Sequence, residues 1–109
     1  MLSNTGYKLI HEKKLTIGFF GGSITEAKGQ NSYRERLNTW FRESYPEAEV
    51  VSVSAAIGGT GTQLGMYRCD RDLNAHHPDL VFFEFAVNDC SEQYEAVAEQ
   101  TETIFRLKL

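Results

Sequence analysis

Three short apolar runs alternate with three segments of helical periodicity, and this alternation constrains the fold more than any other feature of the sequence. The runs, each with the length and composition of a β-strand, are Leu15–Phe20, Glu49–Ser54 and Leu80–Val87. Amphipathic helical spacing is found in residues 32–45, 62–74 and 94–107. The order β-α-β-α-β-α predicts an α/β fold with a parallel sheet, right-handed crossovers and helices on its faces.

The third run, Leu80–Val87, is apolar almost throughout, which is typical of a strand buried on both faces at the centre of a parallel sheet. With three strands, it is central only if the other two flank it. At the edge, it would expose unpaired backbone amides to another chain. The sequence therefore predicts either the front part of a larger fold or a homo-oligomer that pairs through this strand. Six aromatic side chains are expected in the core, namely Tyr33, Trp40, Phe41, Phe82, Phe83 and Phe85.

Composition and charge narrow the classes of partner. The 109 residues are expected to form a single domain, and with a net charge of −4 neither nucleic acid nor an anionic membrane surface is an expected partner. The first apolar run is far shorter than the ~20 apolar residues of a membrane span and follows no leader pattern. Cys69 and Cys90 make no disulfide framework, so we expect a cytoplasmic protein. No metal-ligand cluster or nucleotide motif is found, so no cofactor or metal is expected.

Polar or glycine-rich segments follow each of the three predicted strands. Ser23 comes directly after Gly21-Gly22, residues 56–61 are rich in glycine, and Asn88-Asp89 follows the third run. Because the carboxyl ends of parallel strands meet at one edge of a sheet, these groups are expected to converge. A serine hydroxyl, a glycine amide and an asparagine carboxamide are the components of an acyl-transfer site, in which the serine attacks and the amides hold the oxyanion.

These three segments resemble the sequence blocks of the SGNH (GDSL-type) hydrolases. The matching residues are Gly21–Thr25, Ala55–Gly59 and Val87–Asp89, in the family's order. The resemblance implies a three-layer, flavodoxin-like parallel sheet and a serine esterase or acyl hydrolase whose substrate is a small ester or an acylated carbohydrate. It also implies that Ser23 is the nucleophile and an oxyanion donor, with Gly59 and Asn88 as further donors, and that Asp89 braces its loop.

The sequence departs from the family pattern in two places. Gly22 stands where the family usually has aspartate, a variation associated with members similar to carbohydrate esterases. The family's last block, an aspartate and a histidine near the carboxyl terminus, has no match. His11, His76 and His77 precede strands, so they are expected roughly 20 Å from Ser23, whereas a base needs about 2.6–3.2 Å. We therefore expect a partial SGNH fold, truncated ahead of its general base, with little or no esterase activity on its own.

Other interpretations use the same residues differently. Ser23 followed by Glu26 fits a capping box at the start of a helix. The Gly58–Gly61 segment is compatible with a flexible turn or a phosphate-binding loop, although it lacks the spacing of the nucleotide motifs. A non-catalytic domain that binds an acyl or carboxylate group, or an assembly unit, would need no base.

Overall fold

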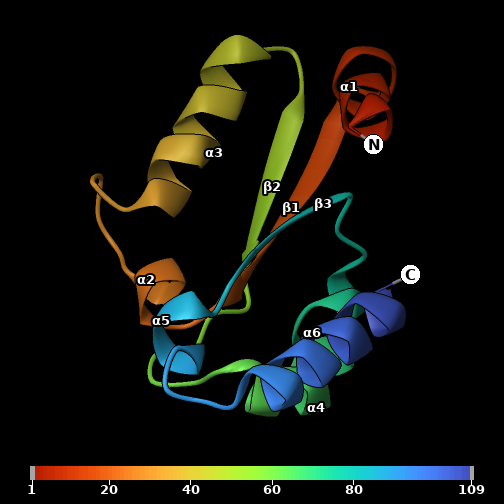
Figure 1. Ribbon diagram of the computed structural model, residues 1–109. Coiled ribbons are helices and arrows are strands. Elements are labelled where there is room, and N and C mark those ends of the chain that lie inside the picture. The colour runs from red at the N-terminus through yellow and green to blue at the C-terminus, as the bar shows by residue number, and fades with distance from the viewer. Residues whose placement is uncertain (1, 109) are drawn as a thin grey trace.

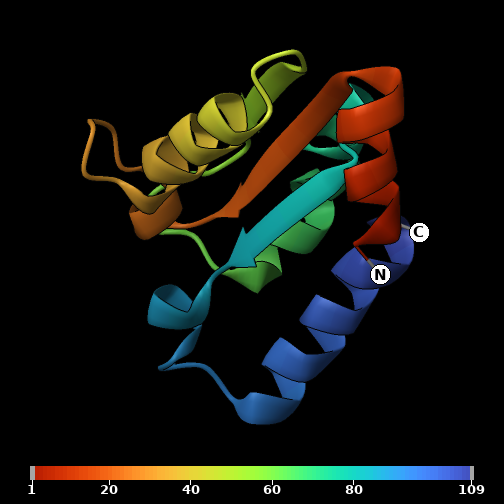
Figure 2. The same cartoon turned by 90° about the horizontal axis from the view of Figure 1, so that it is seen from above.

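The computed structural model describes residues 2–108, and its centre is a three-stranded sheet (Figures 1 and 2). The strands are β1 (Lys14–Gly21), β2 (Glu49–Ser54) and β3 (Leu80–Glu84), in the order β2-β1-β3. Both pairings are parallel, with Lys14 opposite Glu49 and Ile17 opposite Leu80. The predicted α/β fold with a parallel sheet is confirmed.

Helices cover both faces of this sheet and give the fold three layers. The helical elements are α1 (Ser3–Tyr7), the π-helix η1 (Lys8–Glu12), α2 (Ser23–Glu26), α3 (Tyr33–Ser44), α4 (Thr62–Asp72), the 3₁₀ turn η2 (Asn74–His76), α5 (Ala86–Asp89) and α6 (Tyr94–Lys108). Helix α3 lies on one side of the sheet, whereas α4 and α6 lie together on the other (Figure 1). Three helices were predicted close to α3, α4 and α6. The helical segment at residues 3–12 was not predicted, because it is short and carries no sustained apolar periodicity.

Two hydrophobic cores form because successive side chains of β1 point to opposite faces of the sheet. Phe19 and Phe20 are both fully buried, the first in the core under α3 and the second in the core under α4 and α6. The first core consists of Leu9, Leu15, Ile17, Phe19, Phe41 and Val50. The second consists of Phe20, Ala55, Cys69, Leu73, Phe85 and Ile104. The strand buried on both faces is therefore β1.

The third strand is shorter than predicted and lies at an edge of the sheet. β3 ends at Glu84, and α5 follows directly at its carboxyl end (Figure 2). The predicted strand Leu80–Val87 was therefore wrong in its last part: Asp89 N donates to Phe85 O (2.9 Å) in a helical turn, and Val87 is exposed. All of β3 is half-buried, and its outer edge pairs with no other strand of residues 2–108.

Some apolar side chains that the sequence pattern places on buried faces are exposed. Trp40 has 54% of its surface exposed, so its expected place in the core was wrong, whereas its neighbour Phe41 packs against the sheet. On α6, Ile104 is buried, but Tyr94 and Phe105 are exposed. Across residues 2–108, the structure contains no helix with both the length and the apolar character of a membrane span.

Candidate active site

Ser23 lies at the carboxyl end of the central strand, in a tight turn. β1 ends at Gly21, Gly22 is the N-cap residue of α2, and Ser23 is the first residue of that helix. The turn is held through its backbone, because Gly22 N donates to Glu84 O of β3 (3.2 Å). Ser23 is exposed, and its hydroxyl makes no hydrogen bond to another described residue. The hydroxyl is therefore accessible to a substrate.

A buried threonine anchors α2 beneath this turn. Thr25 is fully buried, and its hydroxyl lies 2.8 Å from the Tyr33 hydroxyl of α3 and 3.5 Å from Glu84 Oε2 of β3. Burial raises the pKa of the Tyr33 phenol, and the hydrogen bond with Thr25 opposes that shift. A protonated phenol can donate to Thr25, which leaves the threonine hydroxyl hydrogen for Glu84. Thr25 thus links the helix that carries Ser23 to both α3 and β3.

The loop after β2 brings a left-handed glycine next to the serine turn. Ile57 N donates to Gly21 O (3.1 Å), and Gly58 N donates to the Glu26 carboxylate (2.6 Å). Gly59 has φ +75°, a conformation that favours glycine, and a Cβ there would meet nothing within 4 Å. The Gly59 backbone is therefore presented at an open position.

The capping-box interpretation of Ser23 and Glu26 was wrong. The N-cap residue is Gly22, and the Glu26 carboxylate instead ties α2 to Gly58, 32 positions away. The sequence pattern could not reveal this contact, because the bond joins two elements across the rim of the sheet rather than two turns of one helix.

Asn88 reaches the same rim from the end of β3. Its Nδ2 donates to Thr60 O (2.7 Å). A carboxamide nitrogen carries two hydrogens, so one holds the side chain in place and the other remains for a substrate oxygen. The neighbouring Asp89 accepts a hydrogen bond from Thr62 N (3.0 Å) at the start of α4. The expectation that Asp89 braces its loop is confirmed.

The three predicted site residues come to one rim of the sheet, but not into one enclosed cavity. A Cβ built on Gly58 would lie 3.6 Å from Ser23 Cβ, and a Cβ on Gly22 would lie 2.5 Å from Asn88 Nδ2. Gly59 and Asn88 line a hollow of about 240 Å³, and Ser23 is not part of its lining. The arrangement is therefore an open cradle of amide donors beside an exposed hydroxyl.

The Asn88 contact explains why glycine suits position 22 in this chain, and it gives a prediction. In Gly22→Ala, the new methyl group meets Asn88 Nδ2 and lies 3.2 Å from Thr60 O. We expect Asn88 to leave Thr60, with loss of a hydrogen bond worth about 0.5–1.5 kcal/mol. Nuclear magnetic resonance should detect a displaced Asn88 side-chain amide signal. Gly6→Ala is the matched control, because a Cβ at Gly6 meets nothing within 4 Å; an unmoved Asn88 signal in Gly22→Ala would contradict the prediction.

His76 lies nearer the carboxyl rim than predicted. It lines a hollow together with residues 54–57, beside the end of β2, so its expected place at the amino-end rim was wrong. The reason is that α4 ends halfway along the sheet, where Leu73 packs against Gly18. That hollow does not include Ser23. Among residues 2–108, no histidine forms a hydrogen bond with the serine hydroxyl.

Comparison with known proteins gives one family and several similar structures. The model of the GDSL-like lipase/acylhydrolase family matches residues 19–107. A two-domain esterase active on acetylated mannans is 33% identical over 97% of this chain, with a TM-score of 0.85. A lipase/acylhydrolase from Enterococcus faecalis and an acetylxylan esterase from Geobacillus stearothermophilus, both 24% identical, share the fold over 86% and 85% of this chain, with TM-scores of 0.70 and 0.66. No curated protein sequence matches.

The chain is shorter than these similar proteins. It covers 30% of the mannan esterase chain and 52% of each of the other two. The family match nevertheless extends over most of the chain, from β1 to α6, and the three-layer parallel sheet is that of SGNH esterases. This chain belongs to the GDSL-like lipase/acylhydrolase family.

Proposed function

We propose that this chain carries the nucleophile and the oxyanion donors of an SGNH-type serine esterase that removes acetyl groups from carbohydrate. The observation that supports the proposal is the convergence of the Ser23 turn, the Gly59 loop and the Asn88 side chain at one rim. The substrate class is supported by the similarity to an esterase active on acetylated mannans. An acetylated mannose unit is therefore the substrate to test first.

In the proposed reaction, Ser23 Oγ attacks the carbonyl carbon of the ester, and its proton passes to a base. The carbonyl electron pair moves to the oxygen, which accepts hydrogen bonds from Ser23 N, Gly59 N and the second hydrogen of Asn88 Nδ2. Collapse of this intermediate expels the sugar oxygen, which takes the proton from the base and leaves as a hydroxyl. Water then hydrolyses the acetyl-serine to acetate and free Ser23. Each oxyanion donor is expected to stabilise the transition state by about 2.7–4 kcal/mol.

The reaction needs a base at Ser23, and free imidazole can take that part in an experiment. The wild-type chain and Ser23→Ala are incubated with an acetylated manno-oligosaccharide and increasing imidazole, and released acetate is measured by nuclear magnetic resonance. A positioned base contributes about 10²–10⁴-fold, of which free imidazole should recover part, so the wild type should become about tenfold faster than Ser23→Ala. The Ser23→Ala variant also records the direct reaction of imidazole with the ester.

Asn88→Ala tests the oxyanion donors in the same assay. Removal of one such donor lowers kcat by about 10²–10³, so this variant should lose most of the difference between the wild type and Ser23→Ala. Equal rates for the wild type and Ser23→Ala at every imidazole concentration would contradict the proposed function.

The alternative is a domain that binds acyl or carboxylate groups without turnover, or an assembly unit that pairs with a second copy. The outer edge of β3, which pairs with no other strand in the described part of the chain, favours assembly. The Phe105 ring, exposed beside Phe83 of that strand, adds apolar surface. Acetate binding that Ser23→Ala leaves unchanged would support the binding domain. Sedimentation that depends on protein concentration would support assembly, and a monomer at high concentration would count against it.

A further inference from the structure

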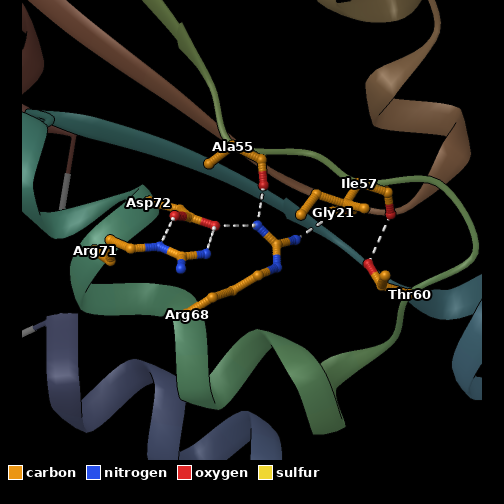
Figure 3. Close-up of polar contacts among 7 residues, drawn as sticks. All are labelled: Gly21, Ala55, Ile57, Thr60, Arg68, Arg71 and Asp72. Carbon is orange, nitrogen blue, oxygen red and sulfur yellow. Dashed lines mark hydrogen bonds and ion pairs between the residues drawn. The ribbon is translucent and has the colours of Figure 1, made fainter.

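A buried arginine lies directly behind the rim that carries Ser23 and Gly59. Arg68, in α4, has 3% of its surface exposed. Figure 3 shows its guanidinium between the ends of two strands: Nη1 donates to Ala55 O, and Nη2 donates to Gly21 O (3.4 Å). Gly21 precedes the serine turn, and Ala55 begins the loop that leads to Gly59. One side chain therefore joins the two backbone segments of the cradle.

The surroundings of Arg68 hold the guanidinium in one orientation. It lies 4.6 Å from the centre of the Phe20 ring and 6.0 Å from that of Phe85. Asp72 accepts a hydrogen bond from Nη1 (3.4 Å) and is itself held by Arg71 (2.6 Å), as Figure 3 shows. The Arg71 hydrogen bond lowers the pKa of Asp72, and burial lowers the pKa of Arg68. The lowered pKa of Asp72 favours its carboxylate, and that carboxylate opposes the effect of burial on the pKa of Arg68.

The positive charge of Arg68 lies against two backbone carbonyl oxygens at the rim of the sheet. Gly21 O and Ala55 O carry partial negative charge close to the rim where an ester oxygen would become negative. The β1–β2 ladder continues past β2 through Ala55 N to Phe19 O (2.8 Å) and Ile57 N to Gly21 O (3.1 Å). Arg68 supplies donors to the carbonyls at this point and so offsets their charge.

A merely space-filling role does not account for an arginine here. Its Nε is buried without a hydrogen-bond partner among residues 2–108, and its neighbours include two aromatic rings. Burial of a guanidinium with an unsatisfied N–H costs free energy that an apolar side chain of similar volume would avoid. An arginine at this position therefore costs more free energy than an apolar side chain would. What it adds is a pair of hydrogen bonds that holds the Gly21 and Ala55 carbonyls at a fixed separation.

We propose that Arg68 is a positioning residue that holds the serine turn and the Gly59 loop in register and cancels the carbonyl charge behind the oxyanion donors. The inference rests on the proposed function for its catalytic consequence, but its geometric content stands on the hydrogen bonds of Figure 3. It assigns a role at the rim to a residue of α4 that the sequence motifs do not mark.

The test compares Arg68→Met and Arg68→Lys with the wild-type chain by amide hydrogen exchange. In Arg68→Met, the Ile57 amide, which bonds to Gly21 O, should exchange about tenfold faster or more relative to the Val51 amide within β2. Arg68→Lys keeps the charge but not the two-pronged donor geometry of the guanidinium. The relative exchange rate of the Ile57 amide in this variant should therefore lie between those of the wild type and Arg68→Met. The lysine variant decides the test if the methionine variant does not fold.

The matched control is Asn38→Ala on the opposite face of the sheet. Asn38 is also buried in a helix, and its Nδ2 donates to Ser52 Oγ of β2 (2.9 Å). This variant should lower overall stability without a selective effect at Ile57. If Arg68→Lys leaves the ratio of Ile57 to Val51 exchange at the wild-type value, or if Asn38→Ala changes it equally, the inference is overturned.

The imidazole-assisted release of acetate separates this inference from the proposed function. With both correct, Arg68→Met should lower the Ser23-dependent rate by at least about tenfold, and Arg68→Lys should restore part of it. If the wild type is no faster than Ser23→Ala, the proposed function fails, and the exchange measurement still decides the positioning role. If Ile57 exchange rises while the Ser23-dependent rate of Arg68→Met equals that of the wild type, the catalytic part of the inference is overturned.

Discussion

Phe20→Ala should lower the free energy of unfolding by about 3–5 kcal/mol. The Phe20 ring is fully buried, and its centre lies 5.2 Å from that of Phe85 and 6.2 Å from that of Phe83. The substitution leaves a cavity under α4 and removes the ring that faces the Arg68 guanidinium. Domains of this kind are stable by about 5–15 kcal/mol, so the loss is a large share of the total. Urea denaturation followed by circular dichroism measures it.

Phe105→Ala is the matched control for this prediction. It removes the same side chain from α6, where Phe105 has 51% of its surface exposed and contacts Phe83 with ring centres 5.2 Å apart. Because half of that ring already meets water, its loss should cost well under half of the Phe20→Ala effect. Equal losses in the two variants would contradict the expectation that the buried Phe20 ring contributes more to stability than the half-exposed Phe105 ring.

Without added imidazole, the chain should release no acetate in a Ser23-dependent way. In a serine protease, removal of the histidine base costs about as much as removal of all three catalytic residues, on the order of 10⁶ in kcat. The structure describes no histidine bonded to Ser23, and a neutral serine hydroxyl is a weak nucleophile. The expected result is that wild type and Ser23→Ala give the same slow hydrolysis of a small acetyl ester, measured by titration of the released acid.

The reaction with added imidazole is the positive control for the expected lack of Ser23-dependent acetate release in plain buffer. Wild type and Ser23→Ala should separate only as imidazole is raised. Ser23-dependent turnover in plain buffer would contradict the expectation, and it would require a base that is already within reach of the serine. His76 would then be the first residue to replace, because it lies nearer the carboxyl rim than the sequence suggested.

The end of β1 and the site segments that follow the strands could be predicted because local sequence determines them. The apolar run that precedes Gly21, the glycine-rich loop around Gly59 and the placement of Asn88 after β3 each follow from neighbouring residues and from the parallel order of the strands. The end of β3 could not be predicted in this way. Residues 85–87 are apolar enough for a strand, but the bonds of Asn88 to Thr60 and of Asp89 to Thr62 turn the chain into α5.

The long-range polar contacts could not be predicted for a similar reason. Arg68 donates to carbonyls 13 and 47 positions away, and Glu26 accepts from an amide 32 positions away. No spacing rule within one helix or strand links such residues. Trp40 shows the converse limit: its place on the apolar stripe of α3 indicated burial, but the helix presents Phe41 to the sheet and leaves Trp40 exposed.

The central place of β1 also has a consequence for the order in which the chain folds. β1 precedes both neighbouring strands in the chain, and the partners in or next to β3 come much later: Thr16 N bonds to Asp79 Oδ2 (2.9 Å) across 63 positions, and Gly22 N bonds to Glu84 O. Such non-local pairings slow folding, because a long loop must close before they form. During synthesis, the turn at Ser23 therefore takes its final shape only after β3, which follows it in the chain, has left the ribosome.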